Sequence, residues 1–209
     1  MGQALVVLLM AAVVWVLYPH PNSELIRAIQ SGDERRMVEI IEHQISSKTM
    51  KYRHVFTADD IRLGYDRTPL AVAAKYCQPR LVDVLLKRYN SNPNLRNSVD
   101  EGTVLFTSAG YDTSGECVRL LLSHPNVDIE AMSKSDWTPL YNAIMFSNAI
   151  AVAHLLRAGA NPHHSIEVMN MGRINALHFA LTHSTPEVAR MLIDRGAYLT
   201  NSGPSAQVR

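Results

Sequence analysis

The sequence is poor in cysteine, with only Cys77 and Cys117 among 209 residues. Two cysteines cannot build a disulfide framework. No CxxC pair and no alternating Cys/His spacing of the kind that binds zinc occurs either. We therefore expect both side chains to be reduced, buried thiols, with Cys117 in the core beside Val118.

Strong net charge and catalytic motifs are also missing. The formal net charge is +1 and no long basic run is present, which argues against a nucleic-acid partner. No GxSxG, Gly-rich phosphate loop or HExxH motif occurs. His178 and His183 are five residues apart and do not share a helix face, so no metal site is expected. We predict no enzyme, cofactor or small-molecule substrate, since a catalytic site would need scattered residues such as His163 and Asp194.

One long hydrophobic run is present, at residues 4–18, and it has fifteen consecutive apolar residues. As a helix it would span ~22 Å, or ~27 Å counted from residue 1, against a hydrocarbon core of about 30 Å. Three interpretations stay open: a short membrane anchor, an apolar tail packed on the domain, and a cleaved signal peptide. The anchor is favoured because Arg27, Arg35 and Arg36 follow the run and no basic residue precedes it. That asymmetry predicts a single-pass protein with the rest of the chain in the cytoplasm. The alternative is a soluble protein of the cytoplasm or nucleus.

Two sequence markers recur in the remainder of the chain at a period near 35. The first is a Thr-Pro-Leu-like triplet, spaced by 35, 35 and 37 residues, at 68–70, 103–105, 138–140 and 175–177. The second is an apolar pair, spaced by 36, 34 and 37 residues, at 85–86, 121–122, 155–156 and 192–193. Because both markers keep the same period and order, the sequence predicts a repeated structural unit.

Each unit has the pattern of two helices. In the first helix, Thr caps the N-terminus, Pro suits the first turn and Leu begins the buried face. Small residues follow, and they let a neighbouring unit approach closely. The second helix carries a Val-x-x-Leu-Leu stripe and ends at Gly in two units, at Gly159 and Gly196. One such unit cannot bury both helices alone, so the units must stack.

These units resemble the ankyrin repeat, a helix–turn–helix unit of about 33 residues with the pattern T-P-L-H-x-A. The similarity is clearest at 136–162 and 175–197, it extends over about 22–200, and His178 stands at the family's His position. It implies an all-α ankyrin-repeat solenoid of about five helix–turn–helix units, preceded here by the N-terminal apolar helix. It also implies a protein that binds other proteins rather than one with a shared chemistry.

The frame divides the chain into five segments. Residues 1–21 form the apolar helix, 22–44 an N-terminal capping unit, 45–65 an inserted loop, 66–200 four repeats and 201–209 a disordered tail. The loop is about a dozen residues over the period, and it is interpreted either as a solvated connection or as a binding element. The linker 163–173 exceeds the period by about two residues.

In arrays of this family the turn tips and the exposed face of the first helices line a concave groove. One residue precedes each Thr position, and another follows it by eight. The second set is a column of rings, Tyr76, Tyr111, Phe146 and His183, which we expect at intervals of about 10 Å. The predicted partner-binding residues are Arg67, Tyr76, Tyr111, Trp137, Met145, Phe146, Ile174 and His183, with Gly102, Lys75 and Met171 nearby. The alternative is that these rings turn inward and seal the seams between units.

The sequence thus predicts a non-catalytic interaction module, attached to a membrane if residues 4–18 form an anchor, that binds a protein partner through its concave groove. The alternative is a structural spacer in a larger assembly, with binding carried by loop 45–65 or by the N-terminal segment. Trp137 is the most informative residue, because the equivalent position tolerates Arg67, Gly102 and Ile174 and therefore has no evident structural requirement.

Overall fold

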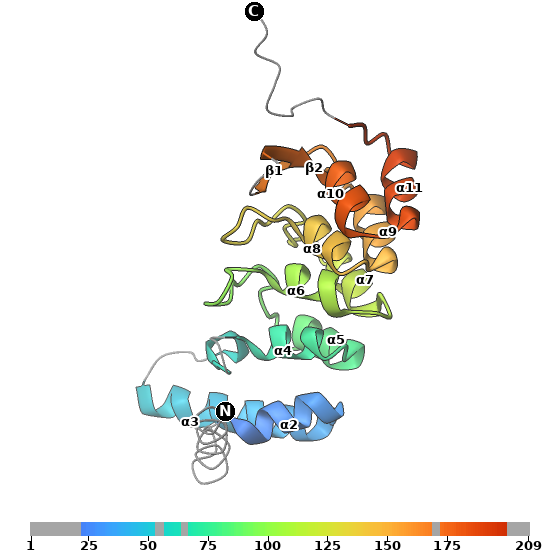
Figure 1. Cartoon of the computed structure of the whole chain (residues 1–209). Helices are drawn as coiled ribbons and strands as arrows, with labels where there is room; N and C mark the ends of the chain where they lie inside the picture. The colour runs from blue at the N-terminus through green and yellow to red at the C-terminus, as the bar shows by residue number, and fades with distance from the viewer. Residues whose placement is uncertain (1–21, 53–56, 64–66, 169–171, 200–209) are drawn as a thin grey trace, which may run out of the picture.

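The computed structural model describes residues 22–52, 57–63, 67–168 and 172–199. Within these residues, ten α-helices form five pairs that stack in chain order into one elongated array (Figure 1). The pairs are α2 (Ser23–Ser31) with α3 (Glu34–Tyr52), α4 (Pro69–Lys75) with α5 (Pro79–Lys87), α6 (Val104–Tyr111) with α7 (Glu116–Leu122), α8 (Pro139–Met145) with α9 (Ala149–Arg157), and α10 (Ala176–His183) with α11 (Pro186–Asp194). The prediction of a mainly helical, ankyrin-type array is confirmed.

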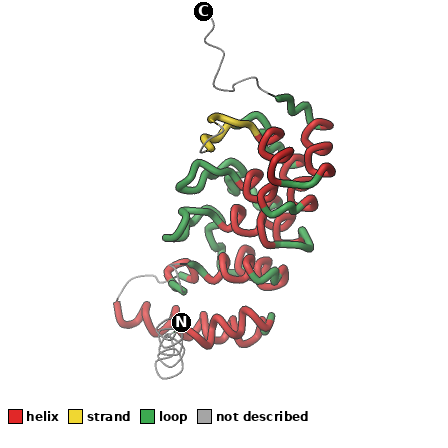
Figure 2. The backbone as a smooth tube through the Cα atoms, viewed as in Figure 1, coloured by secondary structure: helices red, strands yellow, loops and turns green. Residues whose placement is uncertain are grey.

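The first helices of successive pairs pack on one another, and so do the second helices from α5 to α11. Long loops join each pair to the next and project on the side of the first helices, as Figure 2 shows. A stack of this kind has two layers of helices and one row of loops. The face formed by the first helices and the loops is where the predicted groove residues belong.

Local capping explains where most first helices begin. The side-chain oxygens of Thr68, Thr103 and Asn175 accept hydrogen bonds from backbone N–H groups three residues ahead, at 3.3, 3.3 and 3.0 Å. Thr138 departs from this pattern: its Oγ1 is buried and has no hydrogen-bond partner among the described residues. Thr138 is therefore the N-cap residue of α8, as predicted, but without a side-chain hydrogen bond to the helix, and α8 starts on Pro139 at its first turn.

The core follows the repeated markers. The Leu of each triplet and the first Leu of each apolar pair are buried, as are the small residues at the centre of each first helix, Ala73, Ser108, Ala143 and Ala180. Cys117 is buried, and burial, reinforced by Asp112, raises the pKa of its thiol to about 12. The thiol therefore stays protonated. Cys77 is half-exposed, so the expectation of two buried cysteines holds for Cys117 alone.

The segment predicted as an inserted loop, 45–65, is structured over much of its length. Helix α3 continues to Tyr52, because no Gly or Pro interrupts it. A 3₁₀ turn, η1 (Ala58–Asp60), follows, and Ala58, Ile61 and Leu63 are buried. The carboxylate of Asp59 accepts a hydrogen bond from the backbone N–H of Asn92 at 2.8 Å. The solvated loop is therefore a wrong prediction for these residues, since their apolar side chains belong to the core.

The linker before the last pair forms a β-hairpin, so the all-α prediction needs correction. Strands β1 (Ser165–Val168) and β2 (Gly172–Asn175) are antiparallel, with Ile166 opposite Ile174. Both isoleucines are buried, because side chains directly opposite each other on paired strands lie on the same face. Ile174 is therefore not available to a partner, and its prediction as a contact residue is wrong.

Tyr141 holds the hairpin against α8. Its hydroxyl donates to the carbonyl of His164 at 2.7 Å and lies 3.1 Å from the carbonyl of Ile174. The ring is fully buried, and burial raises the pKa of Tyr141 above its usual value. The hydroxyl therefore keeps its proton and remains a donor to the hairpin.

The predicted apolar helix at 1–21 and the predicted tail at 201–209 lie outside the described residues. Across the described ranges, no helix is both long enough and apolar enough to cross a membrane. Membrane attachment through residues 4–18 stays a prediction from the sequence.

Candidate functional site

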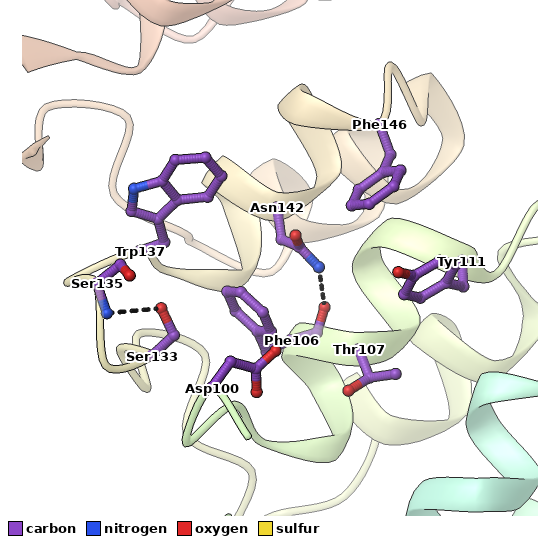
Figure 3. Close-up of a pocket in the computed structure, with 9 residues that line it drawn as sticks. All are labelled: Asp100, Phe106, Thr107, Tyr111, Ser133, Ser135, Trp137, Asn142 and Phe146. Carbon is purple, nitrogen blue, oxygen red and sulfur yellow. Dashed lines mark hydrogen bonds between the residues drawn. The ribbon is translucent and has the colours of Figure 1, made fainter. Parts of the chain in front are cut away.

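A groove opens between the third and fourth helix pairs, on the side of the first helices. Its cavity has a volume of about 300 Å³ (Figure 3). The residues that line it come from α6, α8 and the two loops before these helices: Asp100, Phe106, Thr107, Tyr111, Ser133, Ser135, Trp137, Asn142 and Phe146. Three of the predicted partner-binding residues, Tyr111, Trp137 and Phe146, therefore meet at one site.

The groove exists partly because Gly102 has no side chain. Gly102 occupies the position that Trp137 occupies in the next unit. A Cβ at Gly102 would lie 2.6 Å from Cδ1 of Phe106, so the Phe106 ring fills the space that a side chain there would need. The ring is mostly buried yet lines the cavity. The absence of one side chain thus places an aromatic floor under the groove.

The two pairs that form the groove are held in close register. A Cβ at Gly110 would lie 2.8 Å from Nδ2 of Asn142 and 2.9 Å from Cδ2 of Phe146, so α6 and α8 approach closely at this glycine. Asn142 donates from Nδ2 to the carbonyl of Phe106 at 2.7 Å. Asn148 donates to the carbonyls of Ala109 and Asp112 at 3.1 and 2.9 Å. These hydrogen bonds between units fix the groove walls relative to each other.

Two exposed rings form one wall. Tyr111 and Phe146 are 47% and 49% exposed, and their ring centroids are 5.0 Å apart with the planes tilted by 45°. The predicted interval of about 10 Å between stacked rings is wrong for this pair, because the side chains lean together across the seam. Large apolar rings exposed to this degree, beside a cavity, are typical of a binding surface.

Trp137 has two roles. It is half-buried and packs against the core, and its ring meets Phe179 of the next unit edge-on at 5.3 Å. It is also one of the residues that line the groove (Figure 3). The alternative that a ring seals a seam is therefore correct for part of this side chain.

The other predicted residues lie outside the groove lining. Tyr76, Met145 and His183 are exposed, and the His183 ring stacks on Phe179 at 4.4 Å. Arg67 is half-buried beside a small crevice that it shares with Gly102. Ile174 is buried in the hairpin, Lys75 is half-buried, and Met171 lies outside the described residues. Three of the eight predicted residues thus line this cavity.

Sequence reasoning missed Phe106, Asn142 and Asp100 at this site. Phe106 stands three residues after Thr103, where the last unit has His178, so the repeat frame did contain a signal for it. Nothing in the frame marked Asn142, whose neighbours in the triplet pattern are core residues. Asp100 is the one charged side chain among the lining residues.

Metal-ligating side chains are not clustered in the part of the chain that is described. No group of three or more His, Cys, Asp or Glu side chains there is placed to hold a metal ion. The groove itself contains hydroxyl, amide and aromatic groups and one carboxylate. Such a set suits the recognition of a side chain rather than bond making.

Comparison with known proteins agrees with the repeat frame. Residues 70–166 match the family model for ankyrin repeats in three copies. NF-kappa-B inhibitor delta of Mus musculus is 30% identical over 154 residues, which cover 64% of this chain and 46% of that protein. The putative ankyrin repeat protein FPV024 of fowlpox virus is 32% identical over 131 residues, which cover 62% of this chain and 20% of that protein.

A third relative, the human transient receptor potential cation channel subfamily A member 1, is 26% identical over 172 residues, 65% of this chain and 15% of the channel. The chain spans less than half the length of each of these three relatives. What is shared is therefore the repeat array rather than a whole protein. The repeat frame, the five stacked helix pairs and these matches together show that the chain contains ankyrin repeats.

Proposed function

We propose that the chain is a non-catalytic interaction module that holds a protein partner in the groove between α6 and α8. The observation that carries the proposal is the meeting of Tyr111, Trp137 and Phe146 at one cavity with two of the rings exposed. Aromatic side chains supply most of the energy at protein interfaces when they are grouped around a pocket. Ankyrin repeats are a general protein-binding module, which supports this function class.

The rigidity of the groove adds support. Hydrogen bonds from Asn142 and Asn148 join the two helix pairs, and Gly110 lets the helices approach closely. A preformed site loses little conformational freedom when the partner binds, so more of the contact energy remains as affinity. Tyr76, Met145 and His183 are exposed at the ends of the neighbouring first helices, and we assign them to the rim of the same surface.

The test compares exposed apolar residues inside and outside the groove. Partners are first identified by proximity labelling with the full chain, and one purified partner is then used in binding measurements. The variants Tyr111→Ser and Phe146→Ser should each weaken binding by about tenfold or more, because each removes a ring from the groove wall. Ile193→Ser, which changes a residue 55% exposed on α11, is the matched control and should bind like the wild type.

Circular dichroism and thermal melting are recorded for all three variants. Both groove variants should keep the wild-type spectrum, since the rings that they remove are about half exposed. Wild-type binding by both groove variants, with their fold intact, would contradict the proposal. Partner binding would then have to lie elsewhere on the array.

A further inference from the structure

We propose that the groove between α6 and α8 takes an arginine side chain of the partner. The proposal rests on the proposed function, since it names the group that would occupy the same groove. Two residues of the lining, Asn142 and Asp100, carry oxygen atoms that can accept hydrogen bonds from a ligand. The aromatic rings of the lining restrict which kind of donor group fits between them.

The first acceptor is the amide oxygen of Asn142. The amide orientation is set by the hydrogen bond from Nδ2 to the carbonyl of Phe106 at 2.7 Å, because only the nitrogen can donate there. Oδ1 accepts no hydrogen bond from any described residue, although Asn142 is largely buried and lines the cavity. Figure 3 shows the amide nitrogen turned toward Phe106 and the oxygen turned away from it. Oδ1 is not one of the fully buried unpartnered atoms, so it is accessible from the cavity and can accept a hydrogen bond from a donor that a ligand brings.

The second acceptor is the carboxylate of Asp100. Its Oδ1 is held in place by hydrogen bonds from Nδ2 of Asn97 at 2.6 Å and from the backbone N–H of Gly102 at 2.8 Å. Oδ2 accepts no hydrogen bond from the described residues. Arg96 and Lys134 contact the same loops: the guanidinium of Arg96 donates to the carbonyls of Glu101 and Met132, and the backbone N–H of Lys134 donates to the carbonyl of Asp100. Neither residue is among those that line the cavity, so Asp100 carries the one charge of the lining and favours a cationic ligand over an anionic one.

The rings of the lining add a preference for a flat cation. Phe106, Tyr111, Trp137 and Phe146 present aromatic surface to the cavity. A cation within about 6 Å of a ring centroid is attracted to the ring face. The guanidinium group of arginine is planar, stacks on rings and has five N–H donors in a fixed fork, so it serves two separate acceptors at once. An apolar side chain would bring no donor to either acceptor, and a lysine would stack less well.

The size of the cavity agrees with one side chain. Its volume of about 300 Å³ accommodates a single long side chain with some water rather than a folded element. The groove is open to solvent beside Tyr111 and Phe146, the two half-exposed rings, so a chain can pass over it. The expected ligand is thus an exposed arginine in an extended or loop segment of the partner.

The probes are three acetylated, amidated pentapeptides with the sequence Gly-Ser-X-Ser-Gly, in which X is arginine, citrulline or norleucine. Citrulline keeps the shape of arginine and loses its charge. Each peptide is titrated into the ¹⁵N-labelled full chain, and the indole N–H signal of Trp137 is followed. A Trp15→Phe variant assigns that signal, since the chain has two tryptophans.

The arginine peptide should shift the Trp137 signal with a dissociation constant of the order of millimolar, about threefold to tenfold tighter than citrulline. Asp100→Asn should remove most of that preference, whereas Asp194→Asn, which changes an exposed carboxylate on α11, should leave it unchanged. Raising the salt concentration should weaken the arginine peptide more than the citrulline peptide.

Three results would overturn the proposal: equal binding of arginine and citrulline, tighter binding of norleucine, or no shift with any peptide up to about 10 mM. Tighter binding of norleucine would identify an apolar anchor and would leave the protein-binding groove in place. Failure of the groove itself is measured separately, by wild-type partner binding in Tyr111→Ser and Phe146→Ser.

Discussion

The interior seams of the array and its last helix pair differ at equivalent sequence positions. The residue six after each marker is Ala74, Ala109 or Ile144 in the inner units, and all three are fully buried. In the last unit it is Leu181, which is 56% exposed. The same contrast holds in the second helices, where Leu86 and Leu156 are buried and Ile193 is exposed. A frame position is therefore buried only where another unit packs over it, and among the described residues nothing packs over α10 and α11.

The first helix pair presents a different surface. Arg36 of α3 forms ion pairs with Glu24 of α2 and with Glu39, the latter at 2.7 Å, and these side chains are solvent-exposed. The surface around them is polar, with Arg27, Gln30 and Asp33 nearby. Within the described residues, the outer surfaces of the two terminal pairs thus differ: the first carries charged side chains, and the last carries exposed apolar ones.

The largest expected difference in stability is between glutamine placed at an inner seam and glutamine placed at the equivalent position of the last helix pair. Ile144→Gln should lower the free energy of unfolding by about 3 kcal/mol or more, because it buries an amide without a partner and removes apolar contacts. Leu181→Gln should change it by less than about 0.5 kcal/mol, because the side chain is exposed. Urea denaturation of both variants measures the difference.

A large loss for Leu181→Gln would break the comparison. It would mean that α10 is covered in solution, and sedimentation of the wild type over a range of concentrations would then show whether a second copy of the chain covers it.

A smaller effect is expected at the apolar pairs of the second helices. Leu156→Ala should cost about 2–3 kcal/mol of stability through lost packing and a residual cavity, whereas Ile193→Ala should cost less than about 1 kcal/mol. Thermal melting of the two variants under the same conditions provides the measurement. Similar costs at both sites would contradict the conclusion that burial at this position comes from the next unit.

The smallest effect is expected at the polar first pair. The carboxylates of Glu24 and Glu39 raise the pKa of Arg36 further above its usual value, but the groups are exposed, so solvent screens the attraction. Arg36→Gln should lower the melting temperature less than Leu156→Ala does. The difference from wild type should vanish when salt rises from about 0.01 to 1 M, since the Debye length falls from about 30 to 3 Å. A salt-independent loss would show that the Arg36 side chain contributes by packing instead.

Local sequence signals predicted the helices well because the forces that form them are local. Thr68 and Thr103 cap the next turn, prolines occupy the first turns of several helices, and the first leucine of each apolar pair is buried in all four units. The prediction of secondary structure failed where the sequence carries no clear local marker and contacts with the rest of the chain decide the conformation. Residues 45–52 lack a helix breaker and extend α3. Residues 165–168 and 172–175 pair as strands, and the isoleucine of each strand reaches the core.

The groove was predicted only in part, for a related reason. Tyr111, Trp137 and Phe146 stood out because they are large residues at frame positions with no repeated requirement. Gly102 and Asn142 did not stand out, because the effect of a glycine or an amide at those positions depends on which groups of the surrounding structure lie next to it. Ile174 shares the Trp137 position in the frame, yet it is buried, since its unit is preceded by a hairpin rather than by a loop.

The sequence by itself determined the period, the order of the helices and the family, because caps, first turns and apolar stripes act within one unit. Only the tertiary structure decided which side chains are exposed, because exposure depends on the unit stacked above or below. Trp137 shows the distinction. Its place beside a turn follows from the repeat frame, whereas its contact with Phe179 on one side and with the groove on the other follows from the units on either side of it.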